Sequence, residues 1–308
     1  MLSVAEARAR IVGPLRPTGG EIVALADASG RVLAAPVAAR LTQPPHDVSA
    51  MDGYALRSAD GAAGARLRVT GAAPAGHPFA GTLGSGEAVR VFTGSVIPDG
   101  ADSVIVQEDT EPGDADVFLR EAARAGRHIR RKGQDFREGE TLLAAGRRLA
   151  ARDIGLTAAA NHPWLTVHRR PVIAVLATGD EIAMPGEAIP PGGIVSSNSH
   201  ALAAFIRACG GVPLILPIAR DDRAAIAAAA EAVVRADLLV TSGGASVGAH
   251  DLVRAGLGDR GFAPDFWKIA MRPGKPLMFG KLGATPLLGL PGNPVSSLVC
   301  SLLFLAPI

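Results

Sequence analysis

The chain has 308 residues, of which 48% are hydrophobic, 19% charged and 4% aromatic, with a formal net charge of +2. Near-neutral charge and scarce aromatic rings argue against a nucleic-acid surface, which needs a basic patch with stacking side chains. No run reaches the roughly 18 to 20 uncharged apolar residues of a membrane span. We therefore expect neither nucleic acid nor a membrane as partner, and the length predicts two or three domains.

The N-terminus and the cysteines indicate a cytoplasmic protein. Ser3 and Glu6 form a capping-box pattern at the start of an amphipathic helix, which differs from the pattern of a signal peptide. The two cysteines, Cys209 and Cys300, lie on the apolar faces of predicted helices. We expect both to be buried, reduced thiols.

The residue patterns in the first half of the chain predict two regions of different secondary structure. Residues 1–40 and 138–168 together predict an elongated linker or dimerisation domain, with a helix over 151–161. Residues 41–137 predict a small all-β domain, because short alternating strands are separated by Gly, Pro and Asp turns. Its predicted strands are Arg66–Thr70, Ala88–Phe92, Ser103–Gln107 and Val117–Arg120.

Residues 169–308 predict a three-layer α/β domain with a parallel sheet, because strands alternate with helices there. The predicted strands include Val172–Ala177, Val212–Ile218 and Leu238–Thr241. A helix capped at Asn198 follows the first, and a helix beginning at Asp221 or Asp222 follows the second. The chain as a whole is thus predicted to be an α/β multidomain protein, with ligands bound at the carboxyl ends of its parallel strands.

Two glycine-rich loops are the most informative segments, Thr241–Gly248 and Gly289–Ser296. Each follows an apolar strand-like run, and the second opens a helix with Asn293 as N-cap and Pro294 at the first helical position. Glycine lets the backbone approach an anion, and helix N-termini offer unpaired N–H groups. Either loop alone could be a tight strand-to-helix turn. Together they predict a phosphorylated or otherwise anionic ligand.

Carboxylates and cations follow the same strands. Asp180 and Glu181, Asp221 or Asp222, and Asp251 would gather at one sheet edge, and hard oxygen ligands beside phosphate favour Mg²⁺. Asp221 and Asp251 could instead be N-caps. Lys268 and Arg272 are predicted on one side of a strand within Phe266–Pro276, with Lys275 in the following turn. Three cations would hold a polyanion, although a solvated edge strand is the competing interpretation.

Two further segments carry polar residues without an evident structural role. Residues 44–55 contain the single tyrosine, and residues 128–135 contain three consecutive cations, a pattern that can also be a solvated face. The histidines lack zinc-site spacing, and no GxSxG, GxxxxGK[ST] or strand-linked GxGxxG motif occurs. These absences weaken zinc-site, hydrolase, P-loop and dinucleotide interpretations.

Taken in order, these segments resemble the molybdopterin molybdenumtransferase family, which is related to the E domain of gephyrin. The resemblance covers essentially the whole chain, and although each segment is weak alone, the full series in register is specific. The matching segments are Ser49–Ala55, Thr93-Gly94 with Pro98–Asp102, Arg130–Asp135, Thr178–Glu181, Thr241–Gly248 with Asp251, Arg272–Pro276 and Pro291–Ser296.

The resemblance implies insertion of molybdate into adenylylated molybdopterin with release of AMP, using Mg²⁺ or Zn²⁺. By position it implies Asp52, Asp135, Glu181 and Asp251 as catalytic residues, and Glu181, Asp221 and Asp251 as metal ligands. The substrate-binding residues that it implies are Thr93, Arg130, Arg131, Asp180, Ser242, Gly243, Gly244, Ser246, Lys268, Arg272, Lys275, Gly292, Asn293 and Ser296.

The resemblance also implies partners. Family members form homodimers in which the β domain of one subunit covers the α/β cleft of the other. Such a lid would exclude water from a labile pyrophosphate. An upstream molybdopterin adenylyltransferase is a further expected partner.

The chain departs from the family pattern at several positions. Val48 stands where Asn is usual, Ser196-Ser197 where an acidic residue and Thr are common, and Arg272 where Lys is usual. The Arg change keeps the charge but alters the hydrogen-bonding geometry. The family continues into a C-terminal β-barrel domain, whereas this chain ends in a helix over 295–306 that is apolar all round and predicted to be buried. We expect a truncated chain rather than a short paralogue.

Two functions from different classes remain open. One is the molybdenum-inserting transferase, and the other is a non-catalytic molybdopterin-binding or scaffold paralogue. The transferase is favoured because the whole acidic set is present: Asp52, Asp135, Glu181, Asp221 and Asp251.

Overall fold

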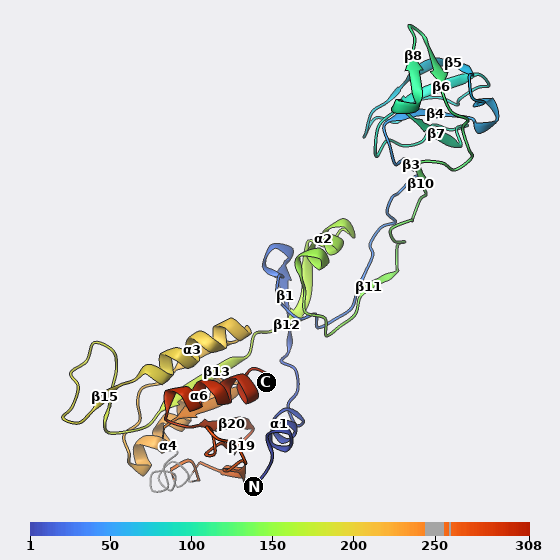
Figure 1. Ribbon diagram of the computed structural model, residues 1–308. Helices are drawn as coiled ribbons and strands as arrows, with labels where there is room; N and C mark the ends of the chain where they lie inside the picture. The colour runs from blue at the N-terminus through green and yellow to red at the C-terminus, as the bar shows by residue number, and fades with distance from the viewer. Residues whose placement is uncertain (244–255, 259) are drawn as a thin grey trace. The chain divides into compact units, whose positions relative to one another are not determined.

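The computed structural model describes residues 1–243, 256–258 and 260–308. The chain forms two compact units (Figure 1), an α/β unit of residues 1–21 and 168–308 and a β unit of residues 22–167. Each unit has its own six-stranded sheet. The predicted α/β multidomain fold is therefore confirmed.

The sheet of the α/β unit is mostly parallel. Its strand order is β16-β13-β17-β20-β19-β18. The first four strands run parallel, and β19 pairs antiparallel with both β20 and the edge strand β18. The parallel part agrees with the prediction, and the antiparallel edge pair is an addition to it. The strands are β13 (Val172–Ala177), β16 (Val212–Ile215), β17 (Leu238–Ser242), β18 (Phe262–Phe266), β19 (Met278–Leu282) and β20 (Thr285–Leu290).

Helices cover both faces of this sheet. Ile173 and Val175 of β13 point into a core formed with α1, α3 and α6, whereas Ala174 and Leu176 point into a core formed with α4. This period of two is what a strand buried on both faces requires, and it produces three layers. The other elements of the unit are α1 (Val4–Val12), β14 (Ile182–Ala183), β15 (Ile194–Val195), α3 (Ser197–Cys209), α4 (Arg223–Glu231), η4 (Ala232–Arg235), α6 (Pro294–Cys300) and the π-helical η5 (Ser301–Leu305).

The β unit is built around the sheet β7-β4-β6-β5-β9-β8. Four of its strands, β5, β6, β7 and β9, are the predicted strands of the small β domain, within a few residues at their ends. The elements from Gly20 onward are β1 (Gly20–Ala24), η1 (Leu25–Asp27), β2 (Val37–Ala38), β3 (Val48–Ser49), β4 (Gly53–Leu56), η2 (Ser58–Asp60), β5 (Arg66–Ala73), β6 (Glu87–Val91), β7 (Ser103–Val106), η3 (Gln107–Asp109), β8 (Thr110–Pro112), β9 (Asp116–Leu119), β10 (Ile129–Arg130), β11 (Thr141–Leu143), α2 (Ala151–Ala159) and β12 (Trp164–His168).

Helix termini confirm some predictions and correct others. The Ser3–Glu6 capping box is present, and Asn293 accepts a hydrogen bond from the Ser296 amide as the N-cap of α6. The predicted N-cap Asn198 is wrong, because α3 begins at Ser197 and Ser196 occupies the cap position. The side chain of Asn198 makes other contacts, described below.

Burial of the C-terminal helix and of one cysteine was predicted wrongly. Cys300 is buried, but Cys209 is exposed, because it lies in the last turn of α3. The helix over 295–306 buries one side only, since Val295 is 65% exposed and Leu302 is 63% exposed. No helix in the described ranges has the length and apolar character needed to cross a membrane.

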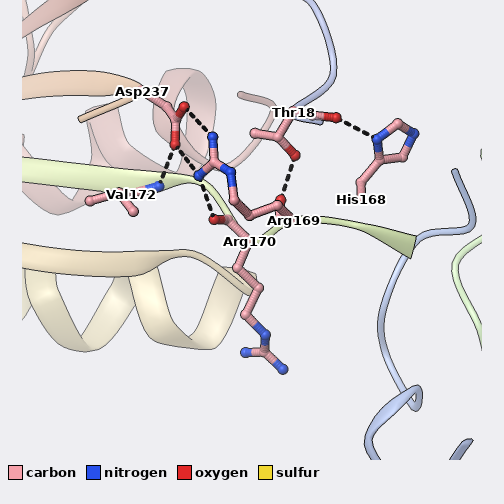
Figure 2. A network of polar contacts seen from close by, with 6 residues as sticks. All are labelled: Thr18, His168, Arg169, Arg170, Val172 and Asp237. Atoms are coloured by element: carbon pink, nitrogen blue, oxygen red, sulfur yellow. Dashed lines mark hydrogen bonds and ion pairs between the residues drawn. The ribbon is translucent and has the colours of Figure 1, made fainter. Parts of the chain in front are cut away.

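A polar network holds the amino end of β13 (Figure 2). Arg169 donates to both carboxylate oxygens of Asp237 at 2.7 and 2.8 Å, and the Val172 amide donates to the same carboxylate at 2.7 Å. The Thr18 hydroxyl donates to the Arg169 carbonyl, and His168 Nδ1 lies 2.6 Å from the Thr18 carbonyl. Because β17 begins at Leu238, this bidentate pair fixes the start of two neighbouring parallel strands.

Asp237→Ala is expected to lower the free energy of unfolding by about 1–2 kcal/mol near pH 7, because the Val172 amide and Arg169 lose a charged acceptor. The hydrogen bonds from Arg169, more than any other cause, hold the pKa of Asp237 below its usual value. The pair therefore contributes fully above the unfolded pKa of about 3.9 and is lost as the pH falls through the lower folded value. Urea unfolding of both proteins across this range measures the difference.

Asp116→Ala is the matched control, because Asp116 pairs with Arg66 at 3.2 Å on a surface where both side chains are more than a third exposed. Its expected effect is within about 0.5 kcal/mol. Equal effects of the two substitutions, or an Asp237→Ala effect that grows as the pH falls, would show that the network does not stabilise the fold as described.

Candidate functional site

A cleft of about 540 Å³ lies at the carboxyl edge of the α/β sheet, a size that suits a small-molecule ligand. The segments after β13, β17 and β20 contribute to it, together with β15 and the start of α3. Its walls are formed by Ala177, Glu181, Ile182, Ile194, Val195, Ser196, Ser197, Asn198, Ser242, Gly243, Pro276, Pro291, Gly292, Asn293, Pro294 and Ser296.

The cleft lies where chain connections leave the sheet in opposite directions. The connection after β13 leads to α3, whose Leu202 and Ile206 pack on one face of the sheet. Leu257, in the segment after β17, packs on the other face. Parallel sheets open a crevice at such a switch point, which is where their ligands bind.

Gly243 of the first glycine loop and Gly292 of the second lie close together at this cleft. Gly243 has φ +100°, and a Cβ placed there would lie 2.8 Å from the Thr178 carbonyl oxygen. A Cβ placed at Gly292 would lie 3.4 Å from the Gly243 Cα. The backbones after β13, β17 and β20 thus approach one another closely, and a side chain at Gly243 would force them apart.

Three carboxylates lie near one another beside the cleft. Glu181 lines it, and the Asp221 amide donates to Asp180 Oδ1 at 3.2 Å. Burial, followed by repulsion from Glu181 and Asp180, raises the pKa of Asp221. Asp222, and not Asp221, caps the helix α4, because Asp222 accepts a hydrogen bond from the Ala225 amide at 2.8 Å. Within the described ranges, no three His, Cys, Asp or Glu side chains form a group ready to hold a metal ion.

The predicted strand within Phe266–Pro276 is wrong. The strand β18 ends at Phe266, and the basic residues Lys268, Arg272 and Lys275 follow in an exposed loop. Two prolines, Pro273 and Pro276, interrupt any ladder there. Among the loop residues, Pro276 lines the cleft.

The N-terminal segment supports this basic loop. The Ala270 amide donates to the Leu2 carbonyl at 2.7 Å, and the Ile269 amide donates to the Lys275 carbonyl at 3.1 Å. Ile269 is fully buried in the same core as Ile11 of α1. Gly274 packs on Cys300 of α6, where an added Cβ would lie 2.7 Å from Sγ. The loop is therefore shaped by residues from both ends of the chain.

A second polar site lies in the β unit, where the structure brings two of the singled-out segments together. The short strands β3 and β10 pair, with Arg130 opposite Val48. Arg130 binds both oxygens of Asp135 at 2.6 and 2.7 Å, and Asp47 accepts from the Lys132 amide at 2.8 Å. Arg131 also pairs with Asp47, so neither of the two arginines stands without a carboxylate.

Asp52 and Thr93 form the other part of this site. Asp52 Oδ1 accepts from the Thr93 amide at 2.7 Å and from its hydroxyl at 2.8 Å. These two bonds, the backbone one first, hold the pKa of Asp52 below its usual value. Asp52 is therefore ionised and fixed in orientation.

The predicted site residues within the described ranges thus divide into three sets. Glu181, Ser242, Gly243, Gly292, Asn293 and Ser296 line the cleft. Asp180, Asp221, Lys268, Arg272 and Lys275 belong to the same unit outside the cleft walls, and Asp52, Thr93, Arg130, Arg131 and Asp135 belong to the β unit. Gly244, Ser246 and Asp251 lie outside the described residues.

Sequence reasoning missed several cleft residues. Ile182, Ile194 and Val195 carry no polar signal, and they reach the cleft because β14 and β15 pair with each other in parallel. The sequence marks Asn198 as a helix cap and Ser196-Ser197 as departures from the family pattern. The available signal was that the helix at Asn198 follows the first parallel strand, whose carboxyl end lies at the edge where ligands bind.

Comparisons with known proteins agree with this geometry. The family described as "MoeA N-terminal region (domain I and II)" matches residues 2–161, and the family described as "Probable molybdopterin binding domain" matches residues 174–308. The second match contains the whole cleft. A solved structure titled as a molybdopterin biosynthesis moea protein from Pyrococcus horikosii aligns with a TM-score of 0.86 at 33% identity, covering 100% of this chain and 78% of that one.

Curated relatives carry one functional name. The molybdopterin molybdenumtransferase of Nostoc sp. is 39% identical over 94% of this chain and 68% of its own length. Molybdopterin molybdenumtransferase 2 of Mycobacterium tuberculosis is 38% identical over 100% of this chain and 78% of its own length. The enzyme of that name from Haemophilus influenzae is 38% identical over 97% of this chain and 74% of its own. The chain belongs to the molybdopterin molybdenumtransferase family.

Proposed function

We propose that this chain inserts molybdate into adenylylated molybdopterin and releases AMP in a Mg²⁺-dependent reaction. Its family makes it a transferase of molybdenum cofactor biosynthesis. The observation that carries the proposal is the cleft at the switch point of the α/β sheet, which combines close backbone approach at Gly243 and Gly292 with the Glu181 carboxylate.

The cleft residues would bind the pterin and its pyrophosphate. Backbone groups at Ser242, Gly243 and Gly292, with Asn293 and Ser296 at the start of α6, can approach phosphate oxygens without an intervening side chain. We propose that Asp180, Gly244 and Ser246 also bind the substrate. Lys268, Arg272 and Lys275 are exposed on the neighbouring loop and would neutralise the pyrophosphate charge.

The carboxylates near the cleft have the chemistry of a magnesium site. Oxygen donors are the ligands that Mg²⁺ prefers. Burial, and after it repulsion from Glu181 and Asp180, raises the pKa of Asp221, and a bound cation would relieve that repulsion. We propose Glu181, Asp221 and Asp251 as the ligands of Mg²⁺, and Zn²⁺ as an alternative ion at the same site. A bound divalent ion would neutralise charge on the pyrophosphate oxygens.

The polar site of the β unit would complete the active site from a second subunit. Asp52 and Asp135 are the proposed catalytic residues of that unit, and Thr93, Arg130 and Arg131 would bind the substrate. This arrangement makes the protein a homodimer with three domains per subunit, 1–40 with 138–168, 41–137 and 169–308. An upstream molybdopterin adenylyltransferase would supply the substrate, because the adenylate is made before molybdate is inserted.

Adding molybdate to the protein, adenylylated molybdopterin and Mg²⁺ is expected to release AMP, because insertion is coupled to cleavage of the phosphoanhydride bond. Chromatographic quantification of AMP with and without molybdate measures this. Intact molybdopterin binding without molybdate-dependent AMP would instead identify a non-catalytic binding or scaffold protein.

Glu181→Gln is expected to lower AMP release by at least about a hundredfold while leaving the melting temperature unchanged, because Glu181 is exposed and a loss of charge there does not disturb the core. Glu187→Gln is the matched control, since Glu187 lies on the same connection between β13 and α3 and its carboxylate accepts a hydrogen bond from the Met184 amide. Equal activity of the two variants would remove Glu181 from the catalytic set.

Mixing inactive Asp52→Ala and Glu181→Gln proteins under subunit-exchange conditions is expected to restore about one quarter of wild-type activity. Half of the dimers would then be mixed, and each mixed dimer would contain one site with both residues intact. If activity stays at the level of the separate variants while mass spectrometry detects mixed dimers, the two residues do not serve one site across subunits.

A further inference from the structure

The side chain of Asn198 joins the two glycine loops of the cleft. Its Nδ2 donates to Ser242 Oγ at 2.9 Å and to the Gly292 carbonyl at 2.7 Å. Ser242 ends β17, and Gly292 lies two residues after the end of β20. One side chain from α3 thus spans two segments that reach the cleft from different strands.

The chemistry of these bonds fixes the orientation of the amide. A backbone carbonyl oxygen can only accept, so the NH₂ group and not the carbonyl oxygen of Asn198 must face Gly292. The same NH₂ group reaches Ser242, so both of its hydrogens are used. Serine, threonine and ionised aspartate cannot replace it, because none of them has two donor hydrogens on one atom.

The side chain of Asn198 does not cap the helix in which it lies. Asn198 is the second residue of α3, and the N-cap position belongs to Ser196, whose side chain bonds Ser199 at 3.0 Å instead of capping the helix. Among the described residues, the pairing of β17 with β20 ends at Ser242 and Leu290. At and beyond that point, the Asn198 side chain is bonded to both segments.

We infer that Asn198 is a positioning residue that sets the distance between the Ser242–Gly243 and Gly292–Asn293 backbones, and through them the affinity for molybdopterin. The inference rests on the proposed function, because it assigns these backbones to substrate binding. Asn198 acts on the loops rather than on the reacting atoms. Its loss therefore weakens substrate binding and leaves the chemical step largely intact.

Asn198→Ala is expected to raise the KM for adenylylated molybdopterin by about tenfold and to change kcat by less than about twofold, because two hydrogen bonds that order the loops are lost. The Kd for molybdopterin, measured anaerobically, is expected to rise by the same factor. Asn161→Asp is the control, an asparagine of the β unit at φ +67° where aspartate is tolerated. A fall in kcat at unchanged KM would overturn the positioning role.

Asn198→Asp tests the need for a donor with a side chain of nearly the same size. An aspartate carboxylate has no hydrogen to donate to the Gly292 carbonyl, and in the first turn of α3 it stays ionised near pH 7. Asn198→Asp should therefore raise the Kd for molybdopterin at least as much as Asn198→Ala. Wild-type affinity of Asn198→Asp near pH 7 would overturn the inference.

Hydrogen exchange separates this inference from the proposed function. In the ligand-free protein, Asn198→Ala should speed exchange of the Ser242–Gly243 and Gly292–Asn293 amides and leave β13 protected. If wild-type protein binds no molybdopterin, the proposed function fails and the exchange result still decides whether Asn198 orders the loops. Unchanged exchange in both loops would refute the positioning role whatever the binding result.

Discussion

The parallel register of β13, β17 and β20 is the constraint on which the cleft depends. Ala177 pairs with Ser242, and Ser242 pairs with Leu290, so the three strands end at one level. Their following segments must then share one edge, and close backbone contact at Gly243 keeps them together. The Arg169–Asp237 pair holds β13 and β17 together at their amino ends. The strand register and this ion pair together determine which residues meet at the site.

Much of the α/β unit could be predicted because its signals are local. The buried run Val172–Ala177 forms β13 with the predicted ends, and the Asn293-Pro294 pair starts α6 as helix-capping chemistry requires. Loops that follow parallel strands gather at one edge by geometry alone, so Glu181, Ser242 and Gly292 could be assigned to one cleft from strand order. These inferences need no knowledge of distant contacts.

The remaining features depend on partners that are distant in the sequence. Asn198 resembles a helix cap in its local context, and its bonds to Ser242 and Gly292 arise only when α3 packs beside β17 and β20. The spacing of Lys268 and Arg272 predicts a strand, but the shape of the basic loop comes from contacts with Leu2 and Cys300. Local pattern thus predicted the elements, whereas the fine structure of the site comes from long-range contacts.

The central claim is that molybdopterin binds in the cleft between the two glycine loops. A crystal structure of the protein soaked with molybdopterin under anaerobic conditions tests it most directly. We expect ligand density between Ser242–Gly243 and Gly292–Asn293, in contact with the wall that contains Glu181. Ligand density elsewhere on the molecule, with these two loops untouched, would contradict it.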